Sequence, residues 1–309
     1  MRPMDANPKA GVAMVLLAAT LWGTTGTAQA LAGGGLSSLW FGALRLLLAS
    51  GFFMLYAVVT SRGAPAGWRR LGVADVLGAG LCMAVYNLAF FAGIRLTGVA
   101  VGTAIALGSG PIWAGLLQAV LQRRPPAAAW WGGTLVAVGG GVLLTSGGAR
   151  AVGDISLAGV ALCLLSGLSY ACYTLLNKRM APHAPASLIT LYAFGIAAAL
   201  AVPFSALESG LPVLSVGDAA AVAYTGIFTA GIAYLLFSRA LLHIAPATGV
   251  TLALGEPVVA FMLAVFVLGE GPSHAAFMGL VLVVLGVGLV VRTELQAGRA
   301  QAARLNALP

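Results

Sequence analysis

Glu256 is the residue whose type and surroundings most directly suggest chemistry. It stands between Gly255 and Pro257 in an otherwise apolar run that continues to Leu268. An ionised carboxylate in such surroundings is costly unless it is paired, hydrated or protonated. Two interpretations are open. The side chain carries a proton or binds a substrate ammonium group, or it holds a neighbouring helix through hydrogen bonds.

The glycine and proline beside Glu256 have counterparts earlier in the chain. Residues 253–273 resemble residues 106–126, so that Gly255 and Pro257 correspond to Gly110 and Pro111. Each proline frees a carbonyl one turn earlier, and paired interruptions of membrane helices mark a central binding site or gate. The alternative is that both prolines make kinks used only for packing.

Aromatic side chains at helical spacing provide candidate walls for such a site. Trp22 and Tyr170 occupy equivalent positions in two similar stretches, and Asn87 adds a polar group beside Tyr86. The candidate substrate-binding residues are Trp22, Tyr86, Asn87, Trp113, Tyr170, Tyr173 and Glu256. The alternative for each aromatic residue is packing or an interfacial position.

Arg45 is a second charge inside an apolar segment, about eight residues from the segment's end, where it can snorkel only partly. We favour a structural ion pair or hydrogen bond for it, and leave the binding of a carboxylate open.

We expect no metal, no cofactor and no enzyme. His183, His243 and His274 lack metal-ligand spacing, and the three cysteines form no Cys-x-x-Cys motif.

The elements that position these residues follow from composition. The chain is 60% hydrophobic and 8% charged, with a mean hydropathy of +1.00, which excludes a soluble globule. A membrane helix needs roughly 20 apolar residues. Candidate helices are centred near residues 20, 48, 82, 109, 136, 165, 197, 228, 257 and 283, which predicts an all-α polytopic membrane protein with ten transmembrane helices.

The similarity between the two halves extends over whole repeats of about 147 residues. We expect a first five-helix repeat at 10–146, a second at 154–292 and a cytoplasmic tail at 293–309. Because five is odd, the second repeat is inverted relative to the first. Gly139–Gly141 and Gly286-x-Gly288 give the fifth and tenth helices close-packing surfaces, so we expect these two helices to form scaffold.

Basic residues gather in alternate loops, as the positive-inside rule requires. The loops expected inside contain Arg2, Lys9, Arg62, Arg69, Arg70, Arg123, Arg124, Lys178, Arg179, Arg239, Arg292, Arg299 and Arg304, and those outside contain only Arg95 and Arg150. Both termini are therefore expected in the cytoplasm. Topology also explains the net charge of +8 better than nucleic-acid binding does, since no basic face is interleaved with aromatic residues.

These residues resemble the drug/metabolite transporter superfamily and, within it, the ten-helix EamA-type proteins. The resemblance is carried by Leu21-Trp22-Gly23, by Ala100-Val101-Gly102 through Pro111, and by Gly255-Glu256-Pro257 through Leu268-Gly269-Glu270. Among its members the chain most resembles bacterial YddG-like aromatic amino acid exporters. The resemblance implies a multi-pass protein of the bacterial inner (plasma) membrane that exports amino acids through a central cavity.

The leading hypothesis is a secondary transporter that exports aromatic and other neutral amino acids, or similar small metabolites, by alternating access. The alternative is a proton-coupled exporter of drugs or other cationic compounds, whose flat cations would stack on the aromatic lining. The partners expected are the small-molecule substrate and the lipid bilayer. Because two repeats are already joined in one chain, a monomer would suffice.

Overall fold

The computed structural model describes residues 7–33, 35–60, 71–121, 123, 125–146, 156–269, 271 and 273–306. Within these ranges the regular structure is entirely helical, and ten helices are long and apolar enough to cross a membrane. The prediction of an all-α protein with ten candidate transmembrane helices is confirmed. The helices are α1 (Pro8–Gly23), α2 (Thr25–Leu31), α3 (Ser38–Thr60), α4 (Val73–Thr97), α5 (Val99–Leu121), α6 (Ala128–Ser146), α7 (Leu157–Met180), α8 (Ala186–Ser209), α9 (Val216–Tyr224), η2 (Thr225–Ile232), α10 (Ala233–Ala240), α11 (Pro246–Leu252), η3 (Ala253–Gly255), α12 (Glu256–Phe266) and α13 (His274–Asn306).

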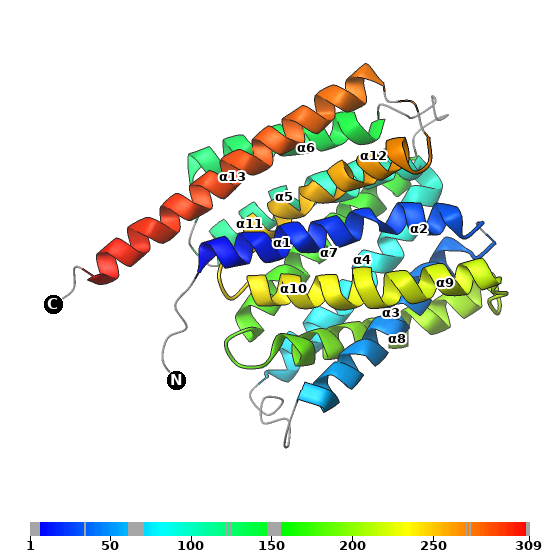
Figure 1. The fold of residues 1–309 in the computed structure, drawn as a ribbon. Coiled ribbons are helices and arrows are strands. Elements are labelled where there is room, and N and C mark those ends of the chain that lie inside the picture. The colour runs from blue at the N-terminus through cyan, green and yellow to red at the C-terminus, as the bar shows by residue number, and fades with distance from the viewer. Residues whose placement is uncertain are drawn as a thin grey trace.

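Three of the spans consist of more than one helical element. The first joins α1 and α2, the eighth joins α9, η2 and α10, and the ninth joins α11, η3 and α12. Figure 1 shows that α1 begins and α13 ends at the same end of the bundle. Helices α6 and α13 form a pair along one flank, while α3 packs on α8 at the other. Helices α4, α5 and α7 pack between these flanks, and α1 packs on α10 and α12.

Glycines bring α6 and α13 into close backbone contact. A Cβ atom on Gly140 would lie 2.8 Å from the Gly279 carbonyl oxygen, and one on Gly286 would lie 2.6 Å from the Gly133 carbonyl oxygen. By contrast, a Cβ on Gly139 would meet no heavy atom within 4 Å. Of the glycines expected to pack, Gly140 and Gly286 therefore form the contact, whereas Gly139, Gly141 and Gly288 face open space.

The two predicted interruptions differ. In the ninth span the α-helix changes to the 3-10 turn η3, which ends at Gly255, and Pro257 lies in the first turn of α12. In the fourth span Gly110 and Pro111 lie inside the continuous helix α5. The predicted break at Gly110 and Pro111 is thus corrected, because one missing N–H does not end a helix whose other bonds continue.

The eighth span contains a π-helical segment, η2, that the sequence analysis did not anticipate. Its glycines lie against α3: a Cβ on Gly226 would be 2.7 Å from the Leu48 Cβ, and one on Gly231 would be 2.8 Å from the Phe52 ring. Such π segments are frequent at functional sites.

Several residues used in the sequence argument lie outside the described part of the chain. They are Arg2, Arg62, Arg69, Arg70, Arg124, Arg150, Glu270 and the ends of two predicted segments, at residues 154 and 309. The side chain of Arg304 is also outside it.

Candidate functional site

A cavity of about 550 Å³ lies within the helix bundle, with walls from α1 to α5, α7, α10, η3 and α12. Its lining extends from Tyr170 and Tyr234 to three residues at helix ends. These are Gln29 near the end of α2, Ser38 at the start of α3 and Val99 at the start of α5. It contains five of the seven residues predicted as substrate contacts, namely Trp22, Tyr86, Asn87, Tyr170 and Glu256. The structure therefore brings together residues from four separate spans.

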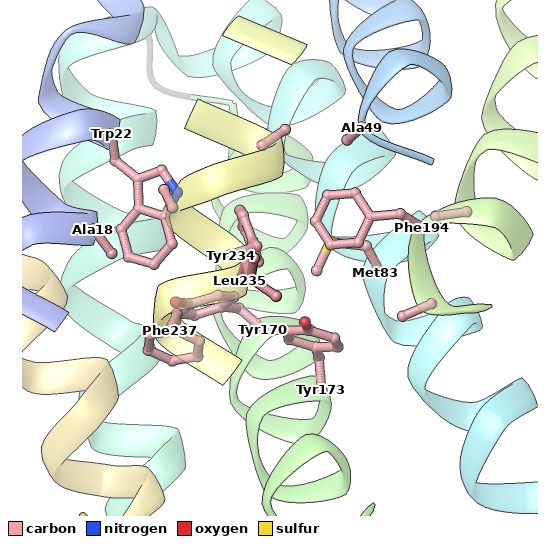
Figure 2. Packing of buried hydrophobic residues seen from close by; sticks show 14 of the residues in the cluster. Ala18, Trp22, Ala49, Met83, Tyr170, Tyr173, Phe194, Tyr234, Leu235 and Phe237 are labelled. Atoms are coloured by element: carbon pink, nitrogen blue, oxygen red, sulfur yellow. The ribbon is translucent and has the colours of Figure 1, made fainter. Parts of the chain in front are cut away.

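An aromatic cluster forms the deep end of this cavity, and Figure 2 shows part of it. The Tyr170 ring lies 5.2 Å from the Tyr86 ring and 5.9 Å from the Phe237 ring, measured between centroids. Trp22 meets Tyr234 edge-on at 5.1 Å. Edge-to-face and offset arrangements of this kind are the favourable ones for aromatic side chains. The result is a packed aromatic floor with the open volume beside it.

Trp22 is fixed in this cluster by its polar atom. Its indole N–H donates to the carbonyl of Thr229 across 2.8 Å, which joins α1 to η2. Only 7% of Trp22 is exposed, so this donor would be costly to leave without a partner. The hydrogen bond sets the face that the ring turns to the cavity.

Two predicted contacts lie outside the cavity lining. Tyr173 is fully buried, and its hydroxyl accepts a hydrogen bond from the Asn177 amide at 3.0 Å. Trp113 packs against the main apolar core, and its buried indole N–H has no partner among the described residues. Neither residue is part of the cavity lining in this conformation, and their contact with a substrate stays a prediction.

Glu256 is the first residue of α12 and lines the cavity. Within the described ranges its carboxylate makes neither a hydrogen bond nor an ion pair. It directly follows the 3-10 turn η3, and its amide donates to the Ala253 carbonyl. The structure thus presents the acid to the cavity instead of to a neighbouring helix.

Three further polar groups of the cavity lining are without partners in the part of the chain that the structure describes. They are the Arg45 Nε, the Asn87 Oδ1 and the Tyr170 hydroxyl. Buried polar groups in proteins are normally hydrogen-bonded. A concave site with convergent, unpaired polar groups beside aromatic rings is the usual form of a small-molecule site.

A second cavity, of about 530 Å³, lies between α5, α6, α12 and α13. It shares Val99, Thr103, Leu107, Glu256 and Ala260 with the first cavity, and its other walls are mostly apolar. Glu256 therefore borders both volumes.

The opposite end of the bundle is held by polar contacts to the loop between α10 and α11. The Lys178 ammonium donates to the carbonyls of Leu241 and Ile244. The Glu294 carboxylate accepts from the Ala245 amide at 3.1 Å and from the Thr248 hydroxyl at 2.6 Å. These contacts tie the loop to both α7 and α13.

The sequence analysis missed Tyr234 and underrated Arg45. Tyr234 lies in the lining one turn before Phe237, and its three-residue spacing from Phe237 was the available signal. Arg45 lines the cavity instead of pairing with an acid among the described residues, which does not support the structural ion pair favoured above. The described residues contain no cluster of three or more His, Cys, Asp or Glu side chains arranged for a metal ion.

Comparison with known proteins identifies the family of this ten-span chain. The EamA-like transporter family matches it twice, over residues 9–146 and over residues 157–292. The chain belongs to the EamA-like transporter family. The cavity described above is therefore the interior of a transporter, in a multi-pass membrane protein.

Two comparisons show how far the similarity of this EamA-like transporter extends. It is 37% identical over 297 residues to "Uncharacterized transporter YwfM" from Bacillus subtilis (strain 168), covering 94% of this chain and 97% of the relative. A protein of known crystal structure superposes with a TM-score of 0.76 at 21% identity, covering 91% of this chain and 97% of that one. At this identity the second comparison shows the fold alone.

Proposed function

We propose that this transporter exports amino acids, aromatic and other neutral ones, or similar small metabolites, by alternating access through the central cavity. The observation that carries the proposal is the lining itself: aromatic rings of Trp22, Tyr86 and Tyr170 adjoin the unpaired carboxylate of Glu256. The rings suit an apolar side chain and the carboxylate suits an ammonium group. Asn87 adds a hydrogen-bonding group on the same wall.

The proposal includes the arrangement of the chain in the bacterial plasma membrane. Two inverted five-helix repeats, at 10–146 and 154–292, would place both termini and the tail at 293–309 in the cytoplasm, following the positive-inside rule. The cavity extends toward the end where α2 ends and α5 begins, which this topology places outside. The conformation is then outward-facing, with the loop contacts of Lys178 and Glu294 closing the cytoplasmic end. A monomer contains the complete cavity.

The test is efflux of labelled phenylalanine from proteoliposomes that contain the purified protein, measured with and without a pH gradient. Wild type is compared with Glu256→Gln, which keeps the shape and removes the charge. Glu208→Gln is the matched control, because Glu208 is exposed near the end of α8 and is not in the cavity lining.

Phenylalanine efflux by wild type supports the proposal. Whether this efflux depends on the pH gradient then shows whether export is coupled to protons. Wild-type efflux that needs the gradient, together with gradient-independent efflux in Glu256→Gln, means that Glu256 carries the proton. Wild-type efflux that does not need the gradient means facilitated export, and loss of efflux in Glu256→Gln is then due to loss of ammonium binding. Absence of amino-acid efflux together with efflux of hydrophobic cations would overturn the proposal in favour of a drug exporter.

A further inference from the structure

Arg45 and Glu256 face the same cavity from different helices without touching each other. Arg45 comes from α3 and Glu256 from the start of α12, and both line the cavity. No nitrogen of Arg45 lies within 4.0 Å of a carboxylate oxygen of any described acid, the criterion for an ion pair. The cavity therefore separates two opposite charges.

In the ranges that the structure describes, neither charged group makes a hydrogen bond or a close ion pair, although the two attract each other across the cavity. The Arg45 Nε is buried and makes no hydrogen bond, and Arg45 itself is half-buried. Unpaired charges inside a membrane bundle are costly and mark substrate or ion pathways. A buried charge without its ion-pair partner is energetically costly. A cavity that keeps Arg45 and Glu256 apart therefore favours a ligand that supplies a partner to each of them.

We propose that Arg45 binds the α-carboxylate of the substrate while Glu256 binds its α-ammonium group. The aromatic residues that line the same cavity, Trp22, Tyr86 and Tyr170 among them, then receive the side chain. This inference rests on the proposed function and narrows it: the substrate class is free α-amino acids in which both charged groups are unmodified. A guanidinium suits this role because its planar array of donors matches a carboxylate in a two-point contact.

The same geometry disfavours the other ligand classes. A simple organic cation would be attracted by Glu256 and repelled by Arg45 in the same cavity. A simple organic anion would be attracted by Arg45 and repelled by Glu256. Only a ligand with both charges satisfies both residues, since each unpaired group would otherwise remain desolvated.

The experiment compares three ligands that differ by one charged group each. Binding of phenylalanine, phenethylamine (no carboxylate) and 3-phenylpropanoate (no ammonium) is measured on the purified protein in lipid nanodiscs. For wild type, phenylalanine should bind about ten- to hundredfold more tightly than either analogue, the amount expected for one hydrogen-bonded charge. In Arg45→Gln the preference over phenethylamine should disappear while the preference over 3-phenylpropanoate stays. In Glu256→Gln the preference over 3-phenylpropanoate should disappear while the preference over phenethylamine stays.

Arg95→Gln is the matched control. Arg95 is exposed near the end of α4 and is not in the cavity lining, so both preferences should be those of wild type. If Arg45→Gln does not fold, Arg45→Lys tests the same role. This variant keeps the positive charge but loses the two-point contact with a carboxylate. Phenylalanine should therefore bind more weakly than to wild type, whereas the binding of phenethylamine should not change.

Two results would overturn the assignment, and they are distinguishable. If wild type binds phenylalanine but Arg45→Gln keeps the full preference over phenethylamine, the proposed function stands and the role of Arg45 is wrong. If wild type binds no amino acid at all, the proposed function fails and the assignment of Arg45 fails with it.

Discussion

Gly23 of α1 lies directly against the backbone carbonyl of Glu256. A Cβ atom at position 23 would be 2.7 Å from that oxygen and 2.6 Å from the Val259 Cβ. The absence of a side chain at Gly23 therefore allows α1 to approach α12 at the depth of the cavity, and it sets where the Glu256 backbone lies.

Gly23→Ala should separate α1 from α12 and move Glu256. Overpacking of this kind costs about 1–3 kcal/mol, so we expect a lower temperature of unfolding and slower phenylalanine efflux from proteoliposomes. Gly51→Ala is the control, because a Cβ at Gly51 meets no heavy atom within 4 Å. Equal effects of the two substitutions would contradict the close approach.

Trp22→Phe should lower stability by about 1 kcal/mol, which is within the range measured for one hydrogen bond between membrane helices. The variant keeps an aromatic ring but leaves the Thr229 carbonyl without its indole donor. Thermal unfolding of purified protein measures the loss. Trp113→Phe is the matched comparison: it removes an indole N–H that has no partner in the described part of the chain, and its unfolding temperature should fall less.

Two adjacent glycines of α6 should respond oppositely to alanine. Gly140→Ala places a Cβ 2.8 Å from the Gly279 carbonyl oxygen and should separate α6 from α13, which lowers thermal stability. Gly139→Ala meets open space and should be neutral or slightly stabilising, since alanine favours helix by about 1 kcal/mol over glycine. If the two variants unfold at the same temperature, α6 and α13 are rotated differently from the arrangement described.

Lys178→Met should loosen the loop between α10 and α11. The substitution keeps most of the side-chain length and removes the donor to the Leu241 and Ile244 carbonyls. Hydrogen bonds from charged groups contribute about 1.5–3 kcal/mol, so amide hydrogen exchange over residues 241–245 should be at least about tenfold faster. Arg179→Met is the control, because Arg179 is exposed and contacts Asp75 instead. Unchanged exchange in Lys178→Met would mean that Glu294 alone holds the loop.

Most of the architecture could be predicted from the amino-acid sequence. The ten spans follow from apolar runs of sufficient length, which depend on local composition and bilayer thickness. That the fifth and tenth helices have close-packing surfaces was also predictable, because their glycines are recognisable small residues within long aliphatic helices. The sequence did not show that these two helices pack against each other, or which glycine of each cluster faces the partner helix.

The two prolines show where local reasoning failed. Pro111 and Pro257 have similar sequence surroundings, yet α5 continues through Pro111 while η3 interrupts the ninth span just before Pro257. A proline removes one hydrogen bond in either case. Whether the helix also changes its winding depends on the neighbouring helices against which its turns pack.

The sequence by itself determined that this chain contains ten segments long and apolar enough to cross a membrane and that Glu256 is an exceptional acid within one of them. Tertiary structure alone decided which aromatic residues line the cavity, since Tyr234 is part of the lining and Tyr173 and Trp113 are not. It also brought Arg45 to face the same space as Glu256. The reason is physical: a buried membrane helix is apolar on most of its surface, so its sequence leaves its rotation undetermined, and only packing against its neighbours fixes which side chains share one volume.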